Sequence, residues 1–307
     1  MNTHIGLIAT ALSLFPTIAQ AQPEEEPKGT VEAAPTSTGT TELGGSGQFA
    51  SAADVDASKA DDATEADIAS GGLFSTGNAR ALSLTGTGNV RIRRKIHQFS
   101  AAFAGNYGRA AVDANSDPQT TVGNVQGRVR YDVFVHDRIS LFAMVTARHD
   151  PFQGFDLRLN IDPGVAFYVL KDAKHRMWTE VGYDYQYDYR TRDAILEKDD
   201  DGNVILDADG NPNVIVDRRR PNHAARLFGG YANSINEHVT FSTGLEYLQS
   251  FLAAKRWRIN WDNILTASLV GNLAVAATFT VRIDNDPAPD IQKVDTITSF
   301  SFVYRFF

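Results

Sequence analysis

The sequence predicts an all-β protein, a transmembrane up-and-down antiparallel β-barrel of about twelve strands. Three observations predict this fold class. After residue 66 the chain alternates apolar and polar residues over unusually long segments, and short and long connections between these segments alternate along the chain. The last segment is an aromatic strand that ends in Phe307.

Composition sets the limits on what this chain of 307 residues is. A hydrophobic content of 43% and a charged content of 21% exclude a wholly disordered chain. Since the sequence contains no cysteine, disulfides, thiolate catalysis and cysteine metal sites are excluded. Because a spanning helix needs about 18 or more apolar residues in succession, and no such stretch occurs, a helical membrane bundle is excluded as well.

The N-terminal region predicts export followed by a tail. An apolar run from Ile5 to Ile18 precedes Ala19-Gln20-Ala21, which has the small-x-small form of a cleavage site, so residues 1–21 read as a signal peptide. The alternative is a buried helix. Residues 22–66 are low in complexity and hold ten acidic residues against two lysines, which predicts a disordered acidic periplasmic tail. An acidic tail beside an electrically balanced body also argues against a nucleic-acid partner.

The period-two segments predict membrane-crossing strands with a polar inner face. They run for about 11 to 15 residues, whereas globular strands have a mode of about 5 to 6 and membrane strands need about 9 to 11. A soluble lipocalin-like barrel is the alternative. Charge on one whole face of nearly every segment favours a wet lumen instead, because charges are costly in a dry core. The expected lumen-facing charges are Arg128, Arg130, Asp132, Arg158, Asp162, Glu180, Asp184, Asp188, Arg226, Glu246, Arg256, Arg258, Asp262 and Arg282.

The connections give an independent test of the barrel. With the N-terminus on the periplasmic side, the short connections fall on that side and the long ones outside, as outer-membrane barrels require. An even number of strands also returns the C-terminus to the periplasm. The expected strands are 67–76, 80–92, 96–107, 121–135, 139–149, 155–170, 175–190, 223–233, 238–251, 256–270, 273–284 and 294–307.

The final strand predicts a contact with outer-membrane assembly machinery. Phe302, Tyr304 and Phe306 alternate, and Phe307 follows as one extra residue. A C-terminal aromatic strand of this form resembles the signal that this machinery reads. An ordinary aromatic strand is the alternative.

Several segments resemble one family. They are Gly72-Leu-Phe-Ser-Thr-Gly-Asn78, the run from Gly154 to Tyr168 that contains Gly-Phe-Asp-Leu-Arg, the run from Trp178 to Asp188, and Asp284-Asn-Asp-Pro before the final strand. Over about residues 67–307 the chain resembles the DUF481 family, whose members include a salt-induced outer-membrane protein. The resemblance implies an outer-membrane barrel in the Gram-negative envelope and supplies no catalytic residues.

Motifs for chemistry are weak. Asp199-Asp-Asp-Gly-Asn and Asp207-Ala-Asp-Gly-Asn are similar to calcium loops, but the second has proline where an EF-hand needs glycine, so polar hairpin turns explain both. Arg218-Arg219-Arg220 reads as a solvated rim, with lipopolysaccharide phosphates as the alternative contact. No nucleophile, metal or phosphate-binding motif occurs, so we expect no catalytic residues and no cofactor.

These observations predict a monomeric barrel in the outer membrane, in contact with its lipids and lipopolysaccharide. The expected function is a passive, porin-like channel or an envelope-stabilising, stress-related protein with a charged lumen. The alternatives are an adhesion or ligand-binding barrel acting through the loop 191–222 and, less favoured, a lipid-modifying enzyme. Twelve strands lie between barrels filled by side chains and open pores, so the sequence leaves open whether the lumen conducts.

Overall fold

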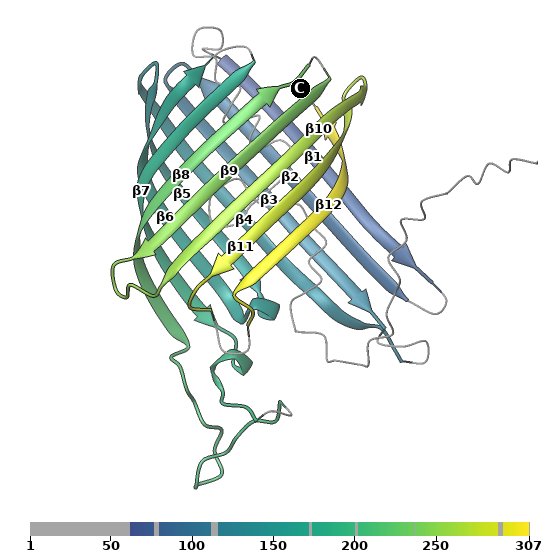
Figure 1. Ribbon diagram of the computed structural model, residues 1–307, viewed down its shortest axis with the longest axis vertical. Coiled ribbons are helices and arrows are strands. Elements are labelled where there is room, and N and C mark those ends of the chain that lie inside the picture. Colours follow the sequence, from purple (N-terminus) through teal and green to yellow (C-terminus); the bar gives the residue numbers. More distant parts are fainter. Residues whose placement is uncertain are drawn as a thin grey trace, which may run out of the picture.

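A computed structural model describes residues 62–306 except for 77–79, 112–115, 172–173, 200–201, 237 and 288–290. The predicted signal peptide, the tail up to residue 61 and Phe307 lie outside the described residues. Within the described part, the chain forms a closed antiparallel barrel of twelve strands, which confirms the predicted fold class (Figure 1). Among these residues, no helix has the length and apolar character needed to cross a membrane.

The strands follow the period-two segments closely. Two single-turn 3-10 helices, Pro151–Gln153 and Asp193–Ile195, lie in the connections after β5 and β7. The strands are β1 (Asp62–Ser75), β2 (Ala81–Arg94), β3 (His97–Ala110), β4 (Gln119–His136), β5 (Ile139–Asp150), β6 (Phe155–Lys171), β7 (His175–Arg190), β8 (Arg219–Ser234), β9 (Val239–Ser250), β10 (Trp257–Val270), β11 (Leu273–Asp284) and β12 (Val294–Arg305).

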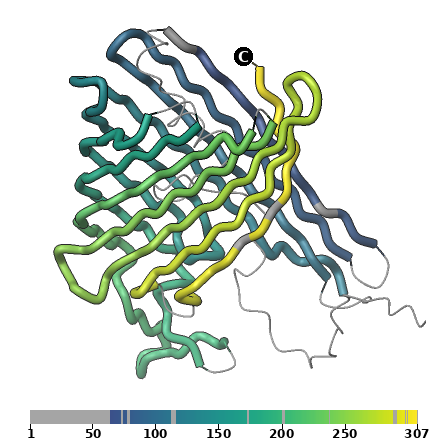
Figure 2. The backbone as a smooth tube through the Cα atoms, turned by 45° about the horizontal axis from the view of Figure 1, so that its top comes forward, coloured from purple at the N-terminus to yellow at the C-terminus, as the bar shows by residue number. Residues whose placement is uncertain are grey.

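Each strand pairs with its sequence neighbours, and β1 closes the barrel by pairing with β12 (Figure 2). The connections 95–96, 137–138, 172–174, 235–238 and 271–272 share one end with the C-terminus, which we call the turn end (Figure 1). The longer connections, including 191–218 and 285–293, lie at the opposite, loop end. The predicted alternation of connection lengths is therefore confirmed, and closure leaves no free sheet edge.

Two predicted boundaries need correction. The strand expected to begin at residue 67 begins at Asp62, because residues 62–66 pair with β2 and Glu65 forms an ion pair with Arg91, so the expected tail overlaps β1. The loop expected to run to residue 222 ends at residue 218. Pro221 lies where β8 pairs with β7 and extends beyond its ladder with β9, a position that tolerates a residue without a backbone N–H.

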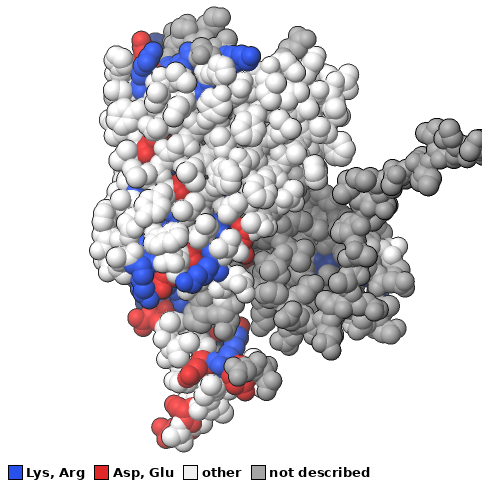
Figure 3. All heavy atoms as spheres, in the orientation of Figure 1, with Lys and Arg blue, Asp and Glu red and all other residues white. Residues whose placement is uncertain are grey.

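The outer face of the barrel is apolar around its whole circumference. Charged side chains gather at the two ends of the flank seen in Figure 3, and the surface between them is largely uncharged. Tyrosine–histidine pairs on neighbouring strands flank this belt, with Tyr131 against His97 at 2.7 Å and Tyr231 against His175 at 2.8 Å. Each strand supplies an exposed apolar side chain: Ile68, Leu84, Phe103, Val129, Leu141, Ile161, Val181, Leu227, Leu245, Leu265, Phe279 and Phe302.

The turn-end half of the interior is packed with apolar side chains that the period-two pattern did not predict. Trp178 and Phe228 have ring centroids 5.9 Å apart, and Phe134 stacks on Tyr168 at the same separation. The expectation of a wet lumen is wrong for this half, because these inward-facing rings are buried and exclude water. The buried cluster comprises Ala69, Phe134, Phe142, Met144, Ala166, Tyr168, Trp178, Phe228, Ala232, Ile264, Ala274, Ala276 and Val303.

The packing of Trp178 depends on Gly230, its register partner on β8. A methyl group at Gly230 would overlap the Trp178 indole, whereas a methyl group at the adjacent Gly229 meets nothing within 4 Å. We therefore expect Gly230→Ala to destabilise the barrel by about 1–3 kcal/mol through overpacking. We expect Gly229→Ala to cost measurably less. Urea unfolding of the purified barrel in lipid vesicles measures both variants, and equal losses would contradict this role for Gly230.

Candidate functional site

The middle of the lumen holds a chain of ion pairs across five strands. Arg130 on β4 binds the Glu180 carboxylate on β7 at 2.8 Å, and the other Glu180 oxygen accepts from Arg226 on β8 at 2.9 Å. Arg226 Nε donates to Glu246 on β9 at 2.6 Å, and Asn260 on β10 donates to Glu246 at 2.8 Å. Glu180, Arg226 and Glu246 meet because they face inward at matching heights of the neighbouring strands β7, β8 and β9, and Arg130 reaches Glu180 from β4, three strands away.

This central chain is dry. Arg226 and Glu246 have no exposed surface, and Glu180 is 3% exposed. The guanidinium carbon of Arg130 lies 4.1 Å from the centre of the Phe142 ring, so the charges rest directly on the apolar cluster. Opposite charges and hydrogen bonds, rather than the water expected from the sequence, offset the cost of burying these charges.

The remaining predicted lumen charges also point inward. Asp132 accepts from Arg130 at 2.8 Å, Arg158 makes a two-point contact with Asp188 at 2.7 and 2.8 Å, and Arg282 contacts Asp262 at 3.1 Å. The others occupy the same interior. Asp162 and Asp184 are fully buried, Arg258 is 4.0 Å from Asp184, Arg128 has Arg130 and Glu180 as charged neighbours, and Arg256 lies at the loop-end rim.

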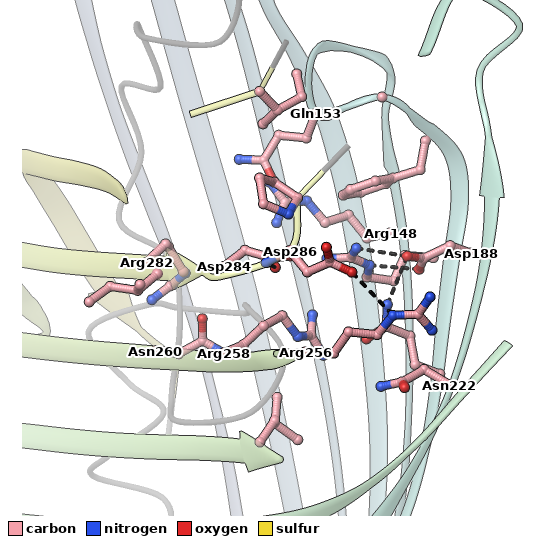
Figure 4. Close-up of a pocket in the computed structure, with 18 of the residues that line it drawn as sticks. Arg148, Gln153, Asp188, Asn222, Arg256, Arg258, Asn260, Arg282, Asp284 and Asp286 are labelled. Carbon is pink, nitrogen blue, oxygen red and sulfur yellow. Dashed lines mark hydrogen bonds and ion pairs between the residues drawn. The ribbon is translucent and has the colours of Figure 1, made fainter. Parts of the chain in front are cut away.

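Between the central chain and the loop end, the lumen opens into a chamber of about 80 Å³ (Figure 4). Arg256 and Asp286 lie near the centre of this view, with Asp188 and Arg148 to one side and Arg282 to the other. Side-chain amides from strands and connections fill much of the rest of the lining. The amide residues are Asn106, Asn124, Gln126, Gln153, Gln186, Asn222, Asn260 and Gln292.

Arginine dominates the charge of the chamber. Its lining also includes four aspartates, Asp188, Asp284, Asp286 and Asp295. A wall with more cations than anions creates a positive potential, which a low-dielectric surrounding strengthens. The lining arginines are Arg148, Arg158, Arg190, Arg220, Arg256, Arg258 and Arg282.

Asp286, in the connection after β11, bridges several of these cations. Its carboxylate pairs with Arg220, with Arg256 at 3.1 Å and with Lys255 at 3.0 Å. Partial burial disfavours its charge, but the hydrogen bonds from Lys255 and Arg220 outweigh that effect and hold the pKa of Asp286 below its usual value. The bridge therefore stabilises the fold at neutral pH, and this contribution is lost only as the pH falls through that lowered pKa.

A second cavity lies outside the chamber. It is an open groove of about 780 Å³ between the stem of the 191–218 loop and the connections 251–256 and 285–293. The groove and the chamber share five lining residues: Arg190, Arg220, Arg256, Asp286 and Pro287. These residues therefore form the boundary between the outer surface and the interior.

The described residues contain no group of three or more acidic or histidine side chains that could hold a metal ion. The Asp-Gly-Asn segments form turns in which Asp199 accepts from the Asn203 amide at 2.8 Å and Asp207 accepts from the Asn211 amide at 2.9 Å. These carboxylates stabilise their own turns. His149 lies on the outer face and contacts the Asp156 carbonyl at 2.7 Å.

The predicted assembly residues lie on the outer face of β12 and just beyond it. Phe302, Tyr304 and Phe306 are exposed, and the Tyr304 and Phe306 rings meet edge to face with centroids 5.2 Å apart. Phe307 lies outside the described residues. This arrangement leaves an aromatic stripe accessible from outside the barrel.

Sequence reasoning missed part of the chamber. Arg190 continues the inward series of Glu180, Asp184 and Asp188 by one more period-two step, and that parity was the available signal. Arg220 was assigned to a solvated rim, whereas it reaches Asp286. No sequence pattern marked Asp286 as a site residue, because its partners Arg220, Lys255 and Arg256 lie far from it in the chain.

An apolar outer belt, a closed ladder of backbone hydrogen bonds and a polar interior together define a membrane-spanning β-barrel with a charged lumen. The family model for DUF481, described as a protein of unknown function, matches residues 68–306. The chain belongs to this family, as its sequence resemblance indicated.

Comparison with solved structures gives barrels of low sequence identity. The NanC porin has 11% identity and a TM-score of 0.41, covering 78% of this chain and 97% of that one. The translocator domain of the autotransporter NalP from Neisseria meningitidis has 9% identity and a TM-score of 0.43, covering 85% and 100%. The outer-membrane channel DcaP of Acinetobacter baumannii has 9% identity and a TM-score of 0.31, covering 80% and 95%. No curated protein matches the sequence.

Proposed function

We propose that this protein is an outer-membrane channel of low conductance that admits small anionic solutes from the loop side. The observation that carries this proposal is the chamber at the loop end, with seven arginines and four aspartates in its lining. Charges lining a pore select for ions of opposite sign. The proposal is narrower than the passive channel expected from the sequence, because inward-facing side chains fill much of the section below the chamber.

Between the chamber and the turn end, the two sides of the lumen differ in the size of their side chains, and this supports a narrow path for solutes. The wall formed by β4 to β10 carries the central ion pairs and the aromatic rings. The opposite wall carries mostly small side chains besides Arg91 and Arg93 of β2 and Arg282 of β11, so side chains occupy less of the section beside it. These small inward-facing residues are Ala69, Thr87, Ala102, Ala104, Ala274, Ala276, Thr278, Thr280, Ser301 and Val303.

Planar-bilayer recording of the purified full-length chain tests the channel. We expect small unitary currents with a reversal potential that favours chloride over potassium in a salt gradient. Exchanging Arg190 and Arg256 for glutamine should shift the reversal potential toward cation permeation, because two of the seven arginines of the lining are removed. Arg94→Gln, at the turn end and outside the chamber, is the control. Absence of conductance above background would refute the channel and leave an envelope-stabilising role.

We propose the outer membrane as the location and a non-enzymatic role. The predicted signal peptide, the parity of the connections and the exposed aromatic stripe of β12 support this location. The ring nitrogens of His97, His175 and His223 pair with tyrosine hydroxyls, which supports structural rather than catalytic roles for these histidines. Fractionation of cells that express the chain, followed by heat-modifiable gel mobility, tests location and folding together.

The long loop supports a second candidate function, docking of a surface ligand. Residues 191–218 form an extended hairpin held by isolated bridges such as Leu196 to Val214, and its outer part exposes apolar side chains. Exposed apolar residues on a protruding segment are typical of an interaction surface. The exposed side chains are Val204, Ile205, Leu206, Val214 and Ile215. If deleting residues 197–213 left adhesion of cells to surfaces unchanged, this candidate would lose its support.

A further inference from the structure

We propose that Arg190, Arg220 and Arg256 form a binding site for an oxyanion, a carboxylate or phosphate group on a small polar solute, and that Asp286 is its tethered competitor. This inference deepens the proposed function, since it names the group that the mouth of the barrel recognises. The three arginines come from the end of β7, the start of β8 and the connection before β10, so the fold alone brings them together.

Arg190 is the residue that requires a ligand. Its side chain is buried, with 4% of its surface exposed, and it lines the chamber. Its Nη1 atom has no hydrogen-bond partner among the described residues, and no described carboxylate forms an ion pair with it. Burying a guanidinium without a counter-charge is costly, so such a group is typical of a site that an anion completes.

The charges around Arg190 do not balance. The charged groups that act on it are Arg220, Asp188, Arg158 and Asp286. Asp188 is already bound at two points by Arg158. Asp286 is shared by Arg220, Arg256 and Lys255, so neither carboxylate is left for Arg190.

Asp286 shows what geometry the site accepts. Its carboxylate already binds two of the three arginines, Arg220 and Arg256, from a connection outside the strands. A carboxylate held by converging guanidinium groups is the arrangement that arginine recognises best, and phosphate oxygens satisfy the same donors. A free oxyanion therefore competes with Asp286 for Arg220 and Arg256 while gaining Arg190.

The position of the site between two cavities indicates how the solute lies. Arg190, Arg220 and Arg256 line both the outer groove and the inner chamber. The groove has a volume typical of small-molecule sites. Side chains such as Gln186 and Asn222 lie on the chamber side, so the body of the solute carries hydroxyl or amide groups that bond to them.

Equilibrium binding to the full-length barrel in detergent tests the site without reference to conductance. Isothermal titration with inorganic phosphate and, separately, with succinate is expected to show saturable binding of at least one, and the pair distinguishes phosphate from carboxylate recognition. We expect Arg190→Gln to weaken the binding about tenfold or more, as loss of a charged hydrogen bond implies. Arg190→Lys keeps the charge without the fork and is expected to bind with intermediate affinity.

The competitor has an effect of opposite sign. Asp286→Asn removes the internal counter-charge, so we expect this variant to bind the same probe more tightly than the wild-type chain. We expect no such gain in affinity in the double variant that combines Asp286→Asn with Arg190→Gln. Arg109→Gln, an arginine at the loop end outside both cavities, is the matched control. Heat-modifiable mobility verifies that each variant is folded.

Two results would overturn the site: no binding of either probe to the wild-type chain, or binding that Arg190→Gln leaves unchanged. Weaker binding by Asp286→Asn would overturn the competitor. Saturable binding without conductance would refute the channel and retain the site, whereas anion-selective conductance without saturable binding of either probe would retain the channel and refute the site.

Discussion

Arg226→Gln is expected to destabilise the barrel by about 3–5 kcal/mol, the cost of breaking a buried ion pair by removal of one partner. Arg226 has no exposed surface and bridges Glu180 at 2.9 Å and Glu246 at 2.6 Å. Its loss breaks the direct ion pair with Glu246 and one of the two ion pairs of Glu180, whose other partner is Arg130. Urea titration of the vesicle-embedded barrel, followed by heat-modifiable mobility, measures the change.

A compensated variant separates burial of charge from loss of packing. The double variant Arg226→Met with Glu246→Leu removes the Glu246 carboxylate together with the arginine. We therefore expect a smaller loss of stability than in Arg226→Gln. Arg94→Gln, at the exposed turn end, should change stability by less than about 1 kcal/mol. A loss in Arg226→Gln no larger than that of Arg94→Gln would mean that the central chain contributes little to stability.

The second large effect concerns the outer belt. Leu245 lies near the middle of β9 and is 51% exposed on the outer face. If lipid covers this face, Leu245→Arg costs about 2–4 kcal/mol, because arginine at the bilayer midplane is strongly disfavoured in membrane barrels. The same vesicle unfolding measurement gives the value.

Depth supplies the control for the belt. Val270 is the last residue of β10 at the turn end and is 75% exposed. Val270→Arg should cost only about 0–1 kcal/mol, since penalties fall toward the interface. Equal costs at the two positions would contradict a membrane-embedded belt. A loss that vanishes in both variants would identify the outer face as water-exposed.

Strands β7 and β1 show which features of the fold could be predicted from the sequence. The run from Glu180 to Asp188 assigned faces correctly, because in a strand side chains alternate strictly, and β7 occupies the predicted residues 175–190. The start of β1 was misplaced, because Asp62 and Glu65 read as part of an acidic tail. Their strand state depends on pairing with Arg94 and Arg91 across β2, which no local signal reveals.

The sequence predicted that charged side chains line the interior, but it did not predict that apolar side chains fill the turn-end half. Phe142, Trp178 and Phe228 occupy inward positions of strands that also carry the inward charges Arg148, Glu180 and Arg226, so alternation alone did not distinguish these rings from the polar face. Their packing depends on which strands face each other across the barrel, and on Gly164 and Gly230, which leave space for the Phe142 and Trp178 rings.

The sequence by itself predicted about twelve strands, the alternation of faces along them and the end at which each connection lies, because all three follow from local periodicity and the order of the chain. Only the tertiary structure decided which charges meet: that Arg226 joins two glutamates, that Asp286 bridges Arg220 and Arg256, and that no carboxylate of the described residues forms an ion pair with Arg190. Alternation gives a side chain its direction. Its neighbours are set by strand register and by closure of β1 on β12, which bring together residues far apart in the chain.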